Sequence, residues 1–297
     1  MNNGAVTFSE CTVIRRDLVF ITAQIADLNQ QGIGHTKVIR WKSDAFAHFM
    51  INWTTTAITS FSNPLALFCM GLDGDIHVFH AGTKSREVIT GPGDIGPLRD
   101  MRIIDGANYA AGMQRQVYRR SASGVWQSLG TPILNKEGIK GFNSIDGYSS
   151  NEIYAVGLDG EIWFFNGSQW HPIDSPTSVS LQRIYCCPSG RAYIVGQAGV
   201  VIVGRGDQWA AIDLGDFRDD LWGVETLNGE VFVSSSKAVY KLVDESLELA
   251  PIESEGIGSA SFLAAGDGVL WSVGSRHLAF TSDGKHWTPV DYNDAAY

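Results

Sequence analysis

The segment 152–165, EIYAVGLDGEIWFF, decides the fold of this chain. It holds two short β-prone runs that flank the turn 158–160, Leu-Asp-Gly, and Asp-Gly supplies the positive backbone angles that tight hairpins require. The first run contains an aromatic residue, two further residues and then a small residue, from Tyr154 to Gly157. The same pattern recurs along the whole chain, which indicates a repeat architecture.

The pattern occurs seven times, and its aromatic residues are spaced by 48, 41, 45, 39, 39 and 39 residues by subtraction. These repeat anchors are Phe20, Phe68, Tyr109, Tyr154, Tyr193, Phe232 and Trp271. Around each anchor, turn signals divide about 40 residues into four short strands. Seven such units predict an all-β fold, a seven-bladed β-propeller of four-stranded antiparallel blades, with six or eight blades as the alternatives.

The predicted propeller is a single domain over residues 1–297, with approximate blades at 8–52, 53–98, 99–139, 140–180, 181–218, 219–258 and 259–292. The first blade fits least well, because residues 25–34 form a long polar insertion. Ring closure has two alternatives: residues 6–8 add to the last blade, or the first and last blades abut. We expect each anchor to pack beside a small residue of a neighbouring blade.

Composition limits the function classes. The chain has 44% hydrophobic residues and a formal net charge of −10, so it can build a core but lacks the basic stripe of a general nucleic-acid binder. No apolar run is long enough for a transmembrane helix, and the first ten residues do not resemble a signal peptide. We therefore expect a cytoplasmic protein that does not bind membranes, with free thiols at its four cysteines.

One segment carries a family resemblance. Residues 281–287, TSDGKHW, resemble the Asp-box hairpin of the bacterial neuraminidase repeat propellers. The matching positions are Ser282, Asp283, Gly284 and Trp287, and the other blades hold only eroded versions. The resemblance implies that the Asp and hydroxyl residues brace a turn while the Trp packs inside. It concerns architecture and implies no activity, and the Arg-Ile-Pro motif of sialidases is absent from the sequence.

Individual residues offer no catalytic site. Asp73 and Asp159 stand in identical Leu-Asp-Gly turns, which explain them without acid–base chemistry. His77 and His80 are three apart on a predicted strand and point to opposite faces, so they do not predict a metal site. The adjacent pair at 186–187, Cys-Cys, is interpreted as buried free thiols. The sequence thus predicts no catalytic residue, no metal and no cofactor.

Charge is unevenly distributed along the chain. Residues 213–255 hold eleven acids against three bases, whereas residues 99–140 hold seven bases against three acids. Because the blades that carry these segments lie roughly opposite in a seven-bladed ring, we expect an electrically bipolar disc. The predicted partner-binding surface, here called the acidic rim, comprises Asp213, Asp216, Phe217, Asp219, Asp220, Asp244, Glu245, Glu248, Glu253 and Glu255. The plain alternative is a solvated surface with no partner. Trp222 is expected to lie in the core.

These features together predict a non-catalytic propeller that binds another protein, one that is itself basic. The most specific prediction is an immunity protein that occludes a basic bacterial toxin, for example a nuclease. Two alternatives remain open: a carbohydrate-binding or glycoside-hydrolysing propeller, and an assembly factor for a larger complex. The carbohydrate alternative requires exposed tryptophans and paired carboxylates around the central pocket. Whether a small molecule also binds is unknown at this point.

Overall fold

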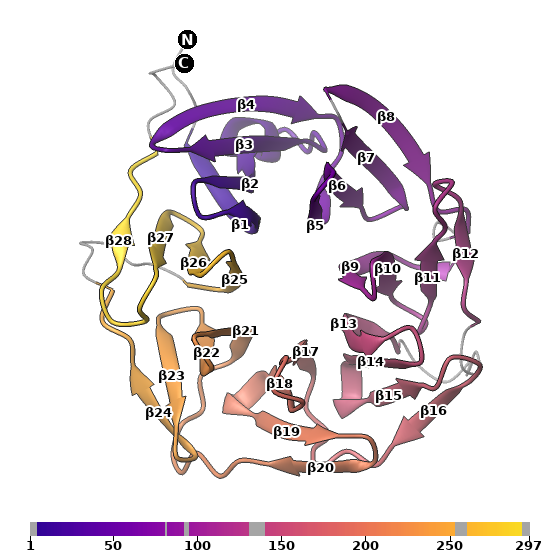
Figure 1. The fold of residues 1–297 in the computed structure, drawn as a ribbon, viewed down its shortest axis with the longest axis vertical. Helices are drawn as coiled ribbons and strands as arrows, with labels where there is room; N and C mark the ends of the chain where they lie inside the picture. Colours follow the sequence, from indigo (N-terminus) through magenta and orange to yellow (C-terminus); the bar gives the residue numbers. More distant parts are fainter. Residues whose placement is uncertain (1–4, 81, 92–94, 131–139, 253–259, 293–297) are drawn as a thin grey trace.

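The computed structural model describes residues 5–80, 82–91, 95–130, 140–252 and 260–292. Within them, 28 strands form seven four-stranded sheets arranged as blades around an axis (Figure 1). In every blade, strands that follow each other in sequence pair antiparallel. The predicted seven-bladed propeller with four-stranded antiparallel blades is therefore confirmed.

The strands of the first four blades have the following bounds. Blade 1 contains β1 (Val6–Arg15), β2 (Leu18–Ile25), β3 (Thr36–Lys42) and β4 (Ala45–Ile51), and blade 2 contains β5 (Thr55–Ser62), β6 (Leu65–Gly71), β7 (Asp75–His80) and β8 (Thr83–Val88). Blade 3 contains β9 (Leu98–Ile104), β10 (Ala107–Gly112), β11 (Val117–Arg120) and β12 (Trp126–Ser128), and blade 4 contains β13 (Phe142–Ser149), β14 (Glu152–Gly157), β15 (Ile162–Phe165) and β16 (Trp170–Ile173).

The remaining blades follow the same plan. Blade 5 contains β17 (Leu181–Cys186), β18 (Ala192–Gly196), β19 (Val201–Arg205) and β20 (Gln208–Ala211), and blade 6 contains β21 (Leu221–Leu227), β22 (Glu230–Ser235), β23 (Val239–Val243) and β24 (Ser246–Leu249). Blade 7 contains β25 (Phe262–Gly266), β26 (Val269–Gly274), β27 (His277–Thr281) and β28 (Thr288–Pro289). The described helices are short: α1 (Ala26–Gln30), η1 (Leu158–Gly160) and η2 (Gln197–Gly199). None of them is long and apolar enough to cross a membrane.

The first strand of each blade lies nearest the axis and the fourth lies at the circumference (Figure 1). Burial is greatest in the second strands, which the neighbouring blades cover on both faces, and least in the fourth strands. The second strand β26 is buried at every position, whereas the fourth strand β16 has no buried residue. We call the face with the interblade connections the connection face. The opposite face, with the turns between first and second strands, is the hairpin face.

All seven repeat anchors lie on the second strand of their blade, where Phe68, Tyr109, Tyr154, Phe232 and Trp271 are buried and Phe20 and Tyr193 are half-buried. The small residue that follows is needed for two reasons. A Cβ on Gly157 would collide with the carbonyl oxygen of Gly141, which precedes the first strand of the same blade. A Cβ on Gly71 would instead lie 2.6 Å from the ring of Trp53, so there an aromatic ring requires the space.

The ring closes by abutment, because β1 pairs with β2 inside blade 1. The backbone N–H of Phe8 donates a hydrogen bond to the carbonyl oxygen of Ser275 in blade 7, at 3.0 Å. After β28 the chain crosses to blade 1, where the ring of Tyr292 meets those of Phe8 and Phe46 edge-on, with centroids 5.6 and 5.1 Å apart. The last described residues thus fasten the end of the chain to its beginning.

Replacing Tyr292 with alanine is expected to lower the free energy of unfolding by about 2 kcal/mol, because two edge-to-face contacts and their buried area are lost at the seam of the ring. Urea denaturation measures the change. The control is Leu249→Ala on β24, whose side chain is 64% exposed and whose truncation should cost little. Equal stability of the two variants would show that Tyr292 does not close the ring.

Candidate functional site

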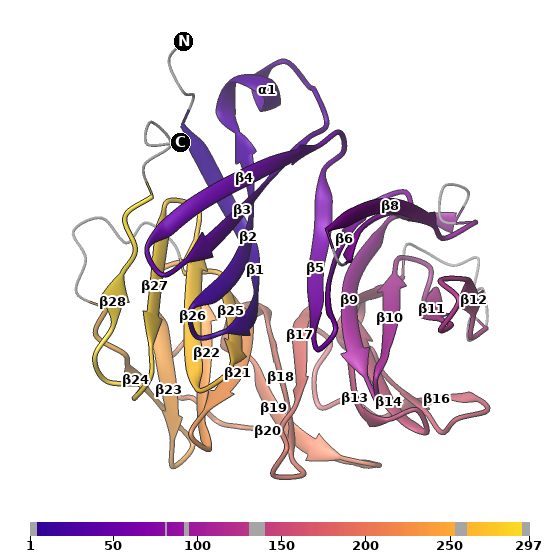
Figure 2. The same cartoon turned by 45° about the horizontal axis from the view of Figure 1, so that its top comes forward.

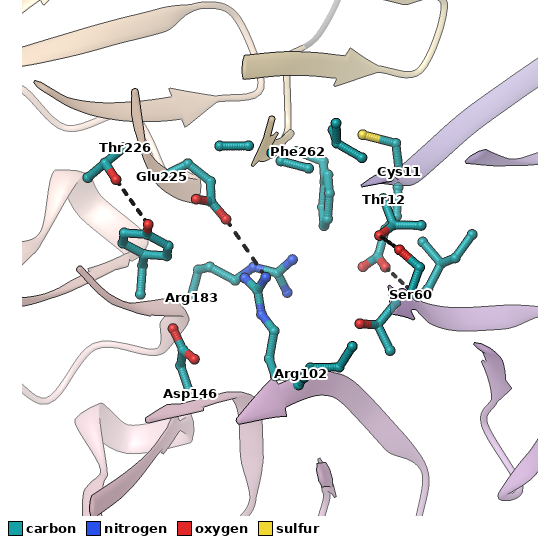
Figure 3. Close-up of a pocket in the computed structure, with 18 of the residues that line it drawn as sticks. Cys11, Thr12, Ser60, Arg102, Asp146, Arg183, Glu225, Thr226 and Phe262 are labelled. Carbon is teal, nitrogen blue, oxygen red and sulfur yellow. Dashed lines mark hydrogen bonds and ion pairs between the residues drawn. The ribbon is translucent and has the colours of Figure 1, made fainter. Parts of the chain in front are cut away.

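The innermost strands enclose a cavity of about 590 Å³ on the axis of the propeller. Its lining reaches the turns that join first and second strands, so it extends to the hairpin face. Five blades contribute six charged residues to its wall: Glu10, Asp100, Arg102, Asp146, Arg183 and Glu225. Figure 3 shows Arg102 reaching into the centre of this channel between neighbouring blades.

Asp100 is the most connected of these carboxylates. Its Oδ2 accepts hydrogen bonds from the Ser144 hydroxyl at 2.7 Å and the Ile145 backbone N–H at 3.1 Å, both on β13. Its Oδ1 accepts one from Nη1 of Arg183 on β17, also at 3.1 Å. The side chain is almost fully buried. A single carboxylate on β9 therefore ties blade 3 to blades 4 and 5.

Glu10 and Asp146 make the same kind of connection elsewhere in the ring. Oε2 of Glu10 accepts from the backbone N–H of Ile58 on β5, at 3.2 Å. Oδ2 of Asp146 accepts from the backbone N–H of Cys186 on β17, at 2.7 Å. Each carboxylate thus joins the innermost strand of its own blade to that of the next. These acids fasten blades together, which is a structural role.

Arg102 has a looser environment. Its Nε lies 3.9 Å from Oδ2 of Asp100 and its Nη1 lies 3.8 Å from Oε1 of Glu225. Both distances exceed the roughly 2.7–2.9 Å of a charge-assisted hydrogen bond. The carboxylates attract this guanidinium across the channel without binding it closely.

Burial controls the ionisation of these groups. It raises the pKa of Glu10 and of Glu225 to about 7, more than the guanidinium groups nearby lower it. The pKa of Asp146 is also raised, mainly by burial. Burial acts on Asp100 in the same direction and is the largest single influence. Arg183, Arg102 and the hydrogen bonds from Ser144 and Ile145 together outweigh it and hold the pKa of that carboxyl below its usual range. The channel therefore gains negative charge as the pH rises through neutrality.

Glu225→Gln should stabilise the protein at pH 8 by about 1–3 kcal/mol, because the folded-state pKa near 7 exceeds the usual 4.5 and ionising the buried carboxyl costs free energy. The native glutamate binds its proton as the pH falls from 7 toward 4.5, so the advantage of the variant should shrink over that window. Urea denaturation between pH 5 and 8 (about 0.5 pH steps) measures this. Glu248→Gln, exposed on β24, is the control. A difference independent of pH would contradict the assignment.

The structure divides the predicted acidic rim between two faces. Asp213, Asp216, Asp219 and Asp220 belong to the connection between β20 and β21, on the connection face. Asp244 and Glu245 form the turn between β23 and β24, which antiparallel pairing places on the hairpin face, and Glu248 follows on β24. Glu253 and Glu255 lie outside the described residues. The acids of the β20–β21 connection and those of the β23–β24 turn therefore lie at opposite ends of the strands of blade 6.

The two aromatic residues beside the connection-face acids differ from expectation. Phe217 is half-buried and packs edge-on against Tyr240, with centroids 5.2 Å apart. Trp222, expected in the core, is 38% exposed instead. The pairing of β21 with β22 shifts register between Leu221 and Gly223. Trp222 lies at this irregularity, so its side chain does not follow the regular alternation of inward and outward residues along the strand. An exposed tryptophan thus stands close in sequence to four acids.

The expected bipolar disc is weakened by pairing between blades. Arg115 of blade 3 binds Glu161 of blade 4. Arg120 binds Glu87 of blade 2, at 2.6 Å. Arg102 points into the channel. Much of the basic charge predicted for blade 3 is therefore neutralised locally and does not form a free positive surface.

The turn of blade 7 that contains Asp283 is held by hydrogen bonds to that residue's carboxylate. Oδ1 of Asp283 accepts hydrogen bonds from the backbone N–H groups of Lys285 and His286, both at 2.8 Å, and Trp287 is buried. The bracing hydroxyl is that of Thr281, which bonds to Asp283, and not that of Ser282. Gly284 has φ +72°, and a Cβ there would lie 2.6 Å from the ring of Phe232. The turn therefore anchors blade 7 on blade 6.

The histidines and cysteines considered in the sequence analysis lie among structural side chains. His77 is half-buried and its ring lies tilted against that of Phe79, with centroids 4.5 Å apart, whereas His80 is exposed. All four cysteines are free, with Cys187 buried and Cys186 half-buried. Among the described residues, no group of three or more His, Cys, Asp or Glu side chains could hold a metal ion. The described lining of the channel includes no tryptophan on which a sugar ring could stack.

Comparison with solved structures supports the class that this geometry defines, a seven-bladed β-propeller. The chain resembles the WD40 propeller domain of Doa1 at a TM-score of 0.73, with 10% identity over 94% of this chain and 96% of that one. It resembles YCF48 bound to D1 peptide at 0.68, with 14% identity over 100% and 98% of the two chains. Virginiamycin B lyase from Staphylococcus aureus gives 0.67, with 10% identity over 80% and 84%. At these identities the likeness concerns the fold alone.

No protein-family model matches the sequence. A curated protein does: the chain is 35% identical over 304 residues to the immune protein Tsi7 of Pseudomonas aeruginosa strain PAO1, covering 96% of this chain and 97% of that protein. This chain belongs to the family of the immune protein Tsi7.

Proposed function

We propose that this chain is an immunity protein, which neutralises a bacterial toxin by binding it in the cytoplasm of the cell that makes both. The observation that carries the proposal is the 35% identity to an immune protein over almost the full length of both chains. The protein acts sterically and without catalysis: one face of the disc covers the active site of the toxin. The channel acids fit this view, because three of them are engaged in joining blades.

The connection face of blade 6 is the proposed docking surface. We call its residues Asp213, Asp216, Asp219, Asp220 and Trp222 the connection patch. An exposed tryptophan beside acids suits an interface core with a charged margin, since tryptophan is enriched among residues that dominate binding energy. The acids attract a basic toxin and speed its association.

Part of this negative charge is engaged within the protein. Asp219 pairs with Lys237 at 2.7 Å, and Oδ1 of Asp220 accepts a hydrogen bond from the backbone N–H of Ala198 at 2.8 Å. Asp213 and Asp216 have no ion pair among the described residues, and both are exposed. These two acids are therefore the members of the patch that are most available to a partner.

The proposal is tested by capture followed by rescue. The purified chain is used as bait in a lysate of the native host, at low and high salt, and each captured protein is then expressed in a test host with and without the chain. The proposal requires a basic protein that stops growth alone and is harmless with the chain, and whose capture is weakened by salt. A captured protein that is not toxic, or whose toxicity the chain does not relieve, would contradict it.

A further inference from the structure

An apolar groove lies between blade 1 and blade 2, whose strands can be followed in Figure 2. It is a cavity of about 310 Å³. Its wall on blade 1 includes Phe20 of β2 and Phe49 of β4, and its wall on blade 2 includes Leu67 of β6 and Phe79 of β7. The rings of Phe49 and Phe79 meet across the interface with centroids 4.0 Å apart.

This groove continues the apolar core between the two blades. Val38, Ile51, Ile58, Leu67 and Cys69 form the buried part of that core, with Phe20, Phe49 and Phe79 packed half-buried against it. Leu65, at the start of β6, lines the groove and is 41% exposed. The groove therefore offers apolar surface that is open to a ligand and rests on the buried core between the two blades.

The polar groups around the groove are basic. Arg40 on β3 stands opposite Phe20 and Ala47 in the strand register, is exposed, and makes no ion pair or hydrogen bond within the described residues. Nζ of Lys84 lies 5.3 Å from the ring centre of Phe49 and 5.2 Å from that of Phe79. His48 and His80 also line the cavity, and its described lining contains no acidic residue. The groove is therefore locally positive although the chain as a whole has a net charge of −10.

We propose that the groove between blades 1 and 2 binds a small aliphatic or aromatic carboxylate. The apolar body of the ligand lies in the groove against the side chains of Phe20, Phe49 and Leu65, and its carboxylate pairs with the guanidinium of Arg40. Cavities of this size with apolar walls and few polar groups are typical small-molecule sites, in which the polar groups fix the orientation of the ligand. The site is independent of the proposed toxin surface, since it shares no residue with the connection patch.

Isothermal titration calorimetry with straight-chain carboxylates tests the proposal on the full chain. Octanoate is expected to bind about ten-fold more tightly than hexanoate, because each buried methylene adds roughly 0.8 kcal/mol. Acetate, which lacks the apolar body, and octylamine, which carries the opposite charge, should not bind measurably. Arg40→Gln should weaken octanoate binding about ten-fold or more through loss of a charged hydrogen bond.

Two variants make the test specific. Arg119→Gln, at an exposed arginine on β11, is the matched charge control and should bind octanoate like the native chain. Ala47→Trp places a large side chain in the groove and should abolish binding. No heat of binding with octanoate, equal affinity for octanol and octanoate, or native-like affinity in Arg40→Gln would overturn the proposal.

Discussion

Asp100→Ala should lower the free energy of unfolding by about 3–5 kcal/mol, the usual cost of removing one partner from a buried ionic network. The substitution takes away the acceptor for Ser144, Ile145 and Arg183 in a single step. The guanidinium of Arg183 is then left buried with its closest carboxylate gone, although its contact with the ring of Phe262 remains. The hydrogen bonds that join blades 3, 4 and 5 are lost together. The loss of stability should therefore exceed that caused by truncating any surface acid.

Urea denaturation of Asp100→Ala beside Glu248→Ala measures this difference. Glu248 is exposed on β24, so its truncation removes a charge without breaking a buried network. We expect a change within about 0.5 kcal/mol for that control. A loss below about 1 kcal/mol for Asp100→Ala would show that the channel network does not hold the blades together.

Trp222→Ala should weaken toxin binding by about 2–4 kcal/mol, or about 30- to 1000-fold in Kd, if the connection patch is the docking surface. The large exposed ring supplies the apolar centre of the contact, and its position on a register shift makes it available. The double variant Asp213→Lys/Asp216→Lys should act differently. It should slow association about ten-fold or more and reduce the salt dependence of the association rate, because it removes steering and leaves the anchor in place.

Surface plasmon resonance with the captured toxin measures both rates. The matched control is Asp244→Lys/Glu245→Lys, which makes the same change of charge in the same blade but on the hairpin face. It should leave the dissociation rate unchanged and the association rate within about two-fold, since long-range charge changes are screened in salt. If this control is the variant that loses affinity, the toxin docks on the hairpin face and the connection patch is not the site.

Much of the fold could be predicted because local signals recur. Dipeptides such as Asp267-Gly268 mark tight turns, and aromatic anchors such as Trp271 return at a nearly constant spacing. Each signal depends on a few neighbouring residues, so sequence alone exposes it. The closure of the ring by Tyr292 had no such signal, because it depends on a contact between the two ends of the chain.

The site was less predictable for physical reasons. Asp100 and Arg183 contact each other from strands 83 residues apart, and only the ring brings them together. The signal that could have revealed them is a charged residue inside an innermost strand that is otherwise apolar, as at Arg102 before Ile103 and Ile104. Trp222 was misplaced because a register shift cannot be inferred from alternation. The two halves of the acidic rim were joined in sequence, but the hairpin geometry of blade 6 sends them to opposite faces.

The most direct measurement is a titration of the toxin's activity with the purified chain. Steric occlusion predicts that inhibition rises in proportion to added chain and is complete at one chain per toxin. It also predicts that activity returns when high salt separates the pair. Full inhibition by far less than one equivalent would mean that the chain modifies the toxin or its substrate catalytically. A toxin that stays active while bound would contradict occlusion of its active site.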